Sequence, residues 1–174
     1  MSRTVPDLLL ASFFAFAIFG NVTVDVWMGL DVDLLDSGFP SDSLPAQYHR
    51  IVWQSGQNYD PLFLDNSGYM RASALGTAVL YFPYYPLAIR ALLAGQGLGT
   101  PGSLTRRYAH IYGCGMLLNM TIVLAMEAIE LFYGTPLAPS LGAYWIPCGA
   151  YWLVPLLVLR RLWREDTEVG EKSL

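Results

Sequence analysis

The stretch LLLASFFAFAIFGNVTVDVWMGL, residues 8–30, decides the fold class. A helix needs about 20 apolar residues to cross the hydrocarbon core of a bilayer. This run is long enough and contains one charged residue, Asp25. It is too long for the apolar core of a secretory signal peptide, and no A-x-A-like cleavage site precedes the next polar stretch. We therefore interpret it as a retained transmembrane helix.

Three further segments are comparably apolar, and they cover residues 72–94, 108–132 and 143–162. Their few charged or titratable residues lie close to the segment ends, at Arg90, His110, Glu127, Glu130, Arg160 and Arg161. Together with the first segment they predict an all-α, polytopic membrane protein built as a bundle of four transmembrane helices.

The composition agrees with this class. Of the 174 residues, 54% are hydrophobic and 14% are charged, whereas an ordinary soluble domain has about 25% charged residues. A soluble fold of this size could not cover its surface with so few charges. The chain also lacks the basic patches with interleaved aromatic residues that are typical of nucleic-acid-binding proteins, so we expect no nucleic-acid partner.

The positive residues predict the orientation, because Lys and Arg near helix ends favour the cytoplasm. The segments assigned to the inner side contain Arg3, Arg90, Arg106, Arg107, Arg160, Arg161, Arg164 and Lys172. The long first loop, 31–71, instead carries six aspartates against Arg50 and Arg71, and the loop at 134–142 has no charge. Both termini are therefore predicted to face the cytoplasm.

We predict one domain over residues 1–164, followed by a polar, disordered tail at 165–174. The first loop is too long for a simple turn, and we expect it either to fold over the mouth of the bundle or to act as a spacer. Within it, residues 45–54 could form a short helix. One side of that helix would carry Tyr48, Ile51 and Val52.

Polar side chains recur inside the predicted helices, where each is costly and needs a reason. Asn21 and Asp25 are four residues apart and share one face of the first helix, and Thr77 and Tyr81 have the same spacing in the second. The last two helices add Asn119, Glu127, Glu130, Cys148 and Trp152. At about 1.5 Å per residue, these positions fall in the outer half and the middle of the bundle, which favours a shared cavity.

Several of these residues have a structural alternative. Asn119 and Thr121 could form interhelical hydrogen bonds, and Glu127 and Glu130 could be solvated charges at the membrane surface. The aromatic residues could pack or anchor the helices at the interface. Asp25 is harder to explain in this way, because a carboxylate in an apolar helix must be paired, hydrated or protonated.

Signatures of soluble enzymes and of metal sites are missing from the sequence. It contains no P-loop, no G-x-S-x-G and no H-E-x-x-H, and His49 and His110 stand far apart. Cys114 and Cys148 lie in apolar segments and are expected to pack as small hydrophobic side chains. We expect neither a metal ion nor a cofactor.

Three blocks of sequence carry a resemblance to a known family: IVWQSGQNYDPLF at 51–63, YFPYYPLAIRALLAG at 81–95 and YWLVPLLVLRRLW at 151–163. In this order and spacing the chain resembles the emopamil-binding protein and sigma-2 receptor superfamily, the four-helix membrane module called EXPERA. The likeness in helix number, topology and long first loop covers nearly the whole chain. It implies a cavity among the helices for sterol-like or cationic lipophilic molecules.

The resemblance also suggests roles for individual residues. The sterol-isomerase branch has His-x-x-x-Glu on its first helix, which matches Asn21 and Asp25 here, with Trp27 following where a tryptophan is usual. Asp60 matches the aspartate of the family's Asp-Pro, and Trp152 resembles its cation-facing tryptophan.

This sequence departs from the family pattern at three of the sterol-isomerase positions. Asn21 replaces the histidine, Thr77 stands where that branch has its second acid, and Gly149 is near the position of an asparagine on the last helix. Sterol Δ8–Δ7 isomerisation as such is therefore not expected. Sigma-2-like members place their key aspartate later, which corresponds to Asp31 here.

We expect a membrane-embedded enzyme that acts on a lipophilic polyene, terpenoid or sterol-like substrate by carboxylate acid–base chemistry, through isomerisation, cyclisation or epoxide opening. The candidate catalytic residues are Asp25, Asp60 and Glu127. The candidate substrate-binding residues are Asn21, Trp27, Asp31, Thr77, Tyr81, Asn119, Cys148 and Trp152. The alternatives are a non-catalytic sterol or lipid binder, and a small structural subunit that pairs with other membrane proteins or with a second copy of itself. In a eukaryote, the expected location is the endoplasmic reticulum membrane.

Overall fold

A computed structural model describes residues 4–33, 35, 38–59, 68–100, 102–132 and 141–172 of the chain. Within these ranges the side chains at 59, 127, 130–132, 141–148 and 168–172 are not described. All regular secondary structure in the described residues is helical, which confirms the all-α prediction.

The first predicted helix is one continuous helical segment with a change of pitch. It consists of α1 (Val5–Gly20), the π-helical η1 (Asn21–Asp25) and α2 (Val26–Gly29). It begins three residues before the predicted start because Thr4 and Asp7 cap its first turn. The backbone N–H and the hydroxyl of Thr4 both donate to Oδ2 of Asp7, at 2.9 and 2.7 Å.

The second predicted helix is divided. α5 (Gly68–Gly76) continues into a second π-helical segment, η2 (Thr77–Tyr81), and α6 (Tyr84–Leu93) follows after a break at Phe82 and Pro83. Proline has no amide hydrogen to continue the helical ladder, which accounts for the interruption at this point.

The remaining two predicted helices are longer than expected. α7 spans Leu104–Phe132, and α8 spans Leu141–Lys172. The prediction of a disordered tail at 165–174 is therefore wrong for residues up to Lys172. At the start of this stretch, Glu165 and Asp166 form ion pairs with Arg106 of α7.

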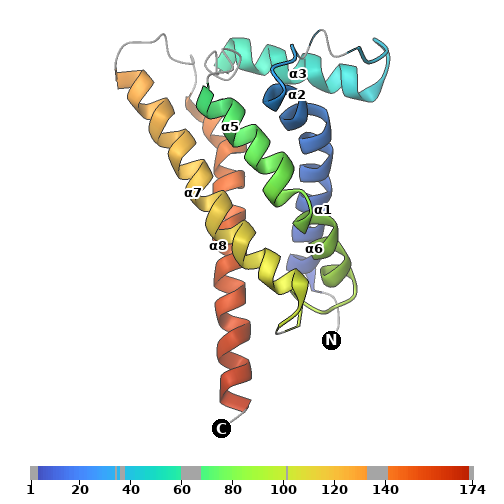
Figure 1. The fold of residues 1–174 in the computed structure, drawn as a ribbon, viewed down its shortest axis with the longest axis vertical. Coiled ribbons are helices and arrows are strands. Elements are labelled where there is room, and N and C mark those ends of the chain that lie inside the picture. Colours follow the sequence, from blue (N-terminus) through green and yellow to red (C-terminus); the bar gives the residue numbers. More distant parts are fainter. Residues whose placement is uncertain are drawn as a thin grey trace.

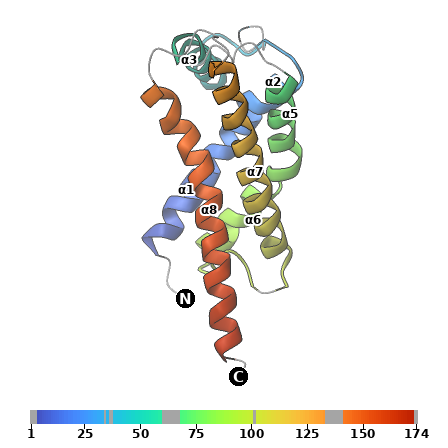
Figure 2. The same cartoon turned by 90° about the vertical axis from the view of Figure 1, so that its left-hand side faces the viewer.

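Figure 1 shows α1, α5 with α6, α7 and α8 running alongside one another, while α3 (Leu44–Tyr59) lies across one end. Figure 2 shows α3 at the same end in a view turned by 90°. The start of α1 and the end of α8 lie at the opposite end (Figure 1). The loop helix predicted at 45–54 thus exists, is longer than expected, and covers the end of the bundle.

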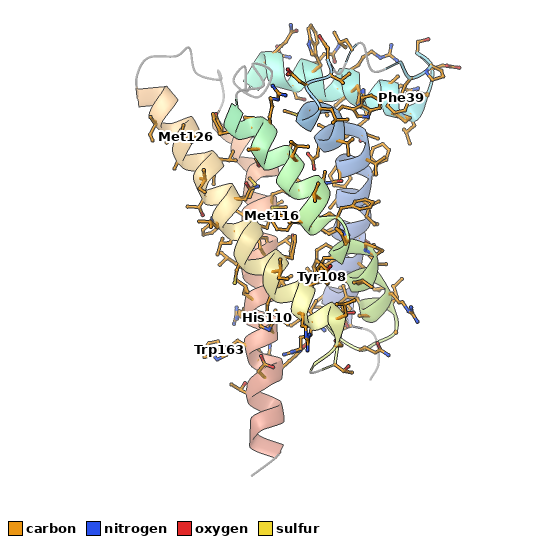
Figure 3. All side chains as sticks on the ribbon, viewed as in Figure 1. Phe39, Tyr108, His110, Met116, Met126 and Trp163 are labelled. Carbon is orange, nitrogen blue, oxygen red and sulfur yellow. The ribbon has the colours of Figure 1, made fainter. Side chains whose placement is uncertain are left out.

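The core of the bundle is aromatic. Phe14 of α1 is fully buried, and its ring centroid lies 5.4 Å from that of Tyr84, 5.8 Å from that of Tyr85 and 5.6 Å from that of Tyr112. Met116, which lies midway along α7 in Figure 3, belongs to the same cluster. These contacts join α1, α6 and α7 in the half of the bundle away from α3.

The hydroxyl groups of Tyr84 and Tyr112 are buried without a hydrogen-bond partner among the described residues. A buried polar group left unpaired costs about 1–3 kcal/mol. We therefore expect Tyr84→Phe and Tyr112→Phe each to raise the thermal unfolding midpoint of the purified protein in detergent. Tyr108→Phe is the control, since Tyr108 is only partly buried and should change little. A lower midpoint in either core variant would mean that its hydroxyl has a binding partner.

An ion-pair network holds together the end of the bundle that lies opposite α3. Arg106 of α7 donates to Glu165 at 2.7 Å, to Asp166 at 2.6 Å, and to the carbonyl oxygens of Gly99 and Leu162. Next to it, Arg161 of α8 pairs with Glu165 at 3.0 Å and with Asp7 of α1 at 2.5 Å. The network therefore connects α1, α7 and α8.

Large apolar side chains are exposed along the outside of the helices, as at Leu9, Phe16, Val79, Leu80, Leu118, Ile122, Leu153 and Leu157. Two described helical segments, Val5–Gly29 and Leu104–Met126, are long and apolar enough to cross a membrane. Only 39% and 28% of their most apolar stretches are buried, whereas the core helix of a soluble protein is mostly buried. This exposure points to an apolar environment around both helices.

Candidate functional site

Asp25 and Asn21 form the centre of the candidate site. The side-chain amide of Asn21, which is buried, donates from Nδ2 to Oδ2 of Asp25 at 3.1 Å. Asp25 itself is partly buried, and no lysine or arginine among the described residues forms an ion pair with it. The spacing in the sequence predicted this pair correctly, since residues four apart meet on one helical face.

Both residues belong to η1, and the predicted pair Thr77 and Tyr81 belongs to η2. The π-helical hydrogen bonds run from the N–H of Val26 to the carbonyl of Asn21, and from Phe82 to Thr77. Isolated π-helical turns are rare and often occur at functional sites. Here η1 and η2 contact each other, so the structure brings together the two segments that contain these predicted pairs.

Threonine side chains offer a local reason for the two π-helical segments. The hydroxyl of Thr23 donates to the carbonyl of Phe19 at 2.6 Å, and that of Thr77 donates to the carbonyl of Ser73 at 3.0 Å. Such bonds to the preceding turn compete with the regular ladder and bend helices. The hydroxyl hydrogen of Thr77 is therefore already used within its own helix.

Tyr81 points into the bundle against α7. Its ring lies 6.0 Å from that of Tyr112, and its side chain is buried. A Cβ atom added at Gly115 would lie 2.7 Å from the Tyr81 hydroxyl oxygen, closer than real contacts allow. Gly115 thus provides the space that this hydroxyl occupies.

Asn119 and Trp152 form hydrogen bonds between helices. Asn119 donates to the hydroxyl of Ser73 at 2.8 Å, which joins α7 to α5. Trp152 donates from its indole nitrogen to the hydroxyl of Thr121 at 3.3 Å, and 38% of Trp152 is exposed. Asn119 and Thr121 therefore form interhelical hydrogen bonds, which is the structural alternative to a role in ligand binding.

Asp31 and Trp27 lie near the end of the bundle covered by α3. Asp31 pairs with Arg71 at 3.0 Å, and its side chain is 56% exposed. The Trp27 ring lies 5.4 Å from that of Phe39, which Figure 3 shows beside α3. The carboxylate of Asp31 is thus engaged with an arginine at the surface, unlike that of Asp25.

Three predicted site residues cannot be placed. Asp60 lies outside the described residues. The backbones of Glu127 and Cys148 belong to α7 and α8, and their side chains lie outside the described part of the structure. His49, by contrast, is buried, and its Nε2 donates to the backbone carbonyl of Thr23, which fastens α3 to η1.

Two tyrosines that sequence reasoning did not assign to the site also lie close to its helix. The ring of Tyr48, on α3, lies 4.9 Å from that of Phe19. Burial, and then the negative charge of Asp25, raise the pKa of the Tyr48 phenol. The hydroxyl groups of Tyr48 and of Tyr151, on α8, both approach Gly20 of α1. In the sequence, the one indication of Tyr48 at this place was its position on the apolar side of the helix predicted in the first loop.

Among the described residues, no three His, Cys, Asp or Glu side chains are grouped in a way that could hold a metal ion. No protein-family model, curated protein or solved structure matches this chain.

Proposed function

We propose that this chain is a multi-pass membrane protein in which all four helical segments cross the bilayer and both termini face the cytoplasm. The two segments that are long and apolar enough to span, and the exposed apolar side chains along the bundle, support the proposal. α5 with η2 and α6 together have a comparable reach, although Pro83 divides them. The arginine-rich end of the bundle would lie on the cytoplasmic side.

This topology predicts where added labels become accessible. Tags at Met1 and Leu174 should both be accessible from the cytoplasmic side only. Single cysteines placed at Asp42 or Ser140 should react with a membrane-impermeant thiol reagent from the opposite side, in a background where Cys114 and Cys148 are replaced by alanine. Reaction of a cysteine at Asp42 from the side that carries the Leu174 tag would contradict the four-span arrangement.

We further propose that the protein is an enzyme of the emopamil-binding-protein type, which acts on a lipophilic polyene, terpenoid or sterol-like substrate. One observation carries this proposal. Asp25 is a carboxylate within a helix of membrane-spanning length, with Asn21 as its one side-chain hydrogen-bond partner among the described residues. Such a group is costly in an apolar setting and is retained most readily where its proton is used.

The proposed chemistry is proton transfer at carbon or at an epoxide oxygen. Asn21 holds Oδ2 of Asp25, so Oδ1 is the oxygen available to the substrate. Protonated Asp25 would add its proton to a double bond, and a second carboxylate would remove a proton from a neighbouring carbon, which moves the double bond with no net change in protons. Asp60 and Glu127 are the candidates for the second group. Tyr81 would orient the substrate, and Thr77, whose hydroxyl hydrogen is bound to Ser73, would do so only as a hydrogen-bond acceptor.

A non-catalytic sterol or lipid binder is the second candidate. Among the described side chains, Asp25 is the one carboxylate of η1 and η2, which contact each other. A lone carboxylate favours binding, because acid–base catalysis needs a second group. A single carboxylate could pair with a cationic group of a lipophilic ligand without any proton transfer.

The test that separates these candidates is turnover. Purified protein in detergent is incubated with defined polyene, terpenoid and sterol compounds, including their epoxides, and the products are identified by mass spectrometry. Conversion that depends on Asp25 supports the enzyme, whereas saturable binding with unchanged compound supports the binder.

A further inference from the structure

The outer faces of α7 and α8 change from apolar to basic toward the end of the bundle opposite α3. On α7, Leu118 and Ile111 are 62% and 52% exposed, and the exposed Arg107 lies one turn beyond Ile111. On α8, the exposed Leu157 is followed by the exposed Arg160. Residues three, four or seven positions apart share a helical face, so on both helices an apolar strip leads to an arginine.

Two further side chains border the seam between these helices. α7 and α8 run in opposite directions (Figure 1), and a Cβ atom added at Gly113 would lie 2.6 Å from the Leu159 side chain. His110 precedes Gly113 and Trp163 follows Leu159, each within about one helical turn of this contact. Both are exposed, and Figure 3 shows them near the end of the bundle that lies away from α3. We call these four exposed residues the basic surface: Arg107, His110, Arg160 and Trp163.

The ion pairs of the fold do not use the charges of this surface. Arg106 and Arg161, the chain neighbours of Arg107 and Arg160, belong to the ion-pair network. Neither Arg107 nor Arg160 forms an ion pair with another side chain in the part of the chain that the structure describes. Trp163 is 72% exposed, the largest value among the described large apolar side chains. Tryptophan near the end of an apolar helix is typical of the headgroup level of a bilayer.

We propose that the basic surface binds an anionic phospholipid of the surrounding bilayer. The acyl chains would lie along the apolar strips, and the phosphate would face Arg107 and Arg160, since a guanidinium group can bind a phosphate through two parallel hydrogen bonds. Trp163 would lie at the level of the headgroup, where its ring has apolar contact and its N–H can donate. A soluble phosphate or an acidic protein segment would use the arginines but leave the apolar strips without a role, so the combination points to a lipid.

This inference rests on the membrane orientation proposed above, and it is independent of the chemistry proposed for Asp25. In that orientation the basic surface lies at the cytoplasmic leaflet, which contains anionic lipids. An arginine close to a membrane surface attracts anionic lipid with an energy that corresponds to about a fivefold gain in affinity.

The experiment compares two phospholipids that differ only in the headgroup. Purified full-length protein in a neutral detergent is titrated with phosphatidylglycerol or with phosphatidylcholine of the same acyl chains, and bound lipid is measured by native mass spectrometry. We expect the wild type to bind phosphatidylglycerol roughly 25-fold more tightly, a factor of about five for each arginine. Arg107→Gln and Arg160→Gln should each reduce this preference about fivefold, and the double variant should bind both lipids equally.

Three controls make the result specific to this surface. Arg90→Gln removes the same charge from an exposed position of α6 at the same end of the bundle, and it should keep the wild-type preference. Trp163→Ala should weaken the binding of both lipids alike, because its contact does not depend on the headgroup charge. An excess of glycerol phosphate should not displace phosphatidylglycerol. Thermal unfolding of each variant shows whether it is folded.

The outcomes separate a lipid site from the other possible occupants. Equal binding of both lipids by the wild type would overturn the inference, as would a preference that survives in the double variant or is lost equally in Arg90→Gln. Displacement by glycerol phosphate, or a dimer that excludes the lipid, would also overturn it, in favour of a soluble anion or a second copy. Preference lost in the folded double variant and kept in Arg90→Gln supports the lipid site. Because binding is measured in detergent, its failure is distinguishable from failure of the orientation, which the labelling at Asp42 and Leu174 tests separately.

Discussion

Asp25→Asn is expected to abolish turnover while the protein remains folded. Asparagine has nearly the same volume, and its side-chain oxygen can still accept the hydrogen bond from Nδ2 of Asn21, so the local geometry is kept. It cannot transfer a proton at Oδ1. General acid–base catalysis by a positioned side chain is worth about 10²–10⁴-fold in rate, and we expect a loss of that size in kcat for the conversion found in the turnover assay.

The matched control for this prediction is Asp31→Asn. Asp31 lies six positions later in the chain, and its pair with Arg71 is exposed on both sides, so its removal should cost about 0–1 kcal/mol of stability and leave turnover unchanged. Full activity of Asp25→Asn would remove this residue from the chemistry. If activity were lost in Asp31→Asn and retained in Asp25→Asn, the functional aspartate would be the later one.

Arg106→Ala is expected to have the largest effect on stability. The Arg106 side chain is 6% exposed and binds two carboxylates and two backbone carbonyl oxygens. The carboxylates of Glu165 and Asp166 are 27% and 51% exposed, so water can solvate them after the change, and the cost is below that of a fully buried ion pair. The loss of several charge-assisted hydrogen bonds still predicts a destabilisation of about 1.5–3 kcal/mol. We expect a clearly lower thermal unfolding midpoint in detergent, together with faster proteolysis of the last turns of α8.

Two variants make this measurement specific to the network. Arg107→Ala removes the same charge from the exposed neighbouring position and should melt as the wild type does. Arg106→Lys keeps the charge but loses the planar fork that reaches Glu165 and Asp166 at once, so its midpoint should fall between the other two. An Arg106→Ala protein as stable as Arg107→Ala would show that α8 is held without these ion pairs.

The Asp25 and Asn21 pair shows which part of the candidate site can be predicted from sequence. Their contact is local, because helical periodicity alone places residues four apart on one face. The π-helical geometry around them could not be predicted in the same way. It depends on side-chain hydrogen bonds such as that of Thr23 to Phe19, and on packing of η1 against η2, which hydrophobic periodicity does not report.

The sequence by itself determined the all-α class, the approximate ranges of the four long helical segments and the presence of a helix in the first loop. Apolar length and helical spacing are properties of a continuous stretch of chain. Only the tertiary structure decided which faces meet. It brought Tyr48 and Tyr151 to Gly20, directed Trp152 to Thr121, and paired Arg106 of α7 with Asp166 of α8. These contacts join residues that are far apart in the chain, and their energy comes from packing and charge pairing between elements, which no local pattern encodes.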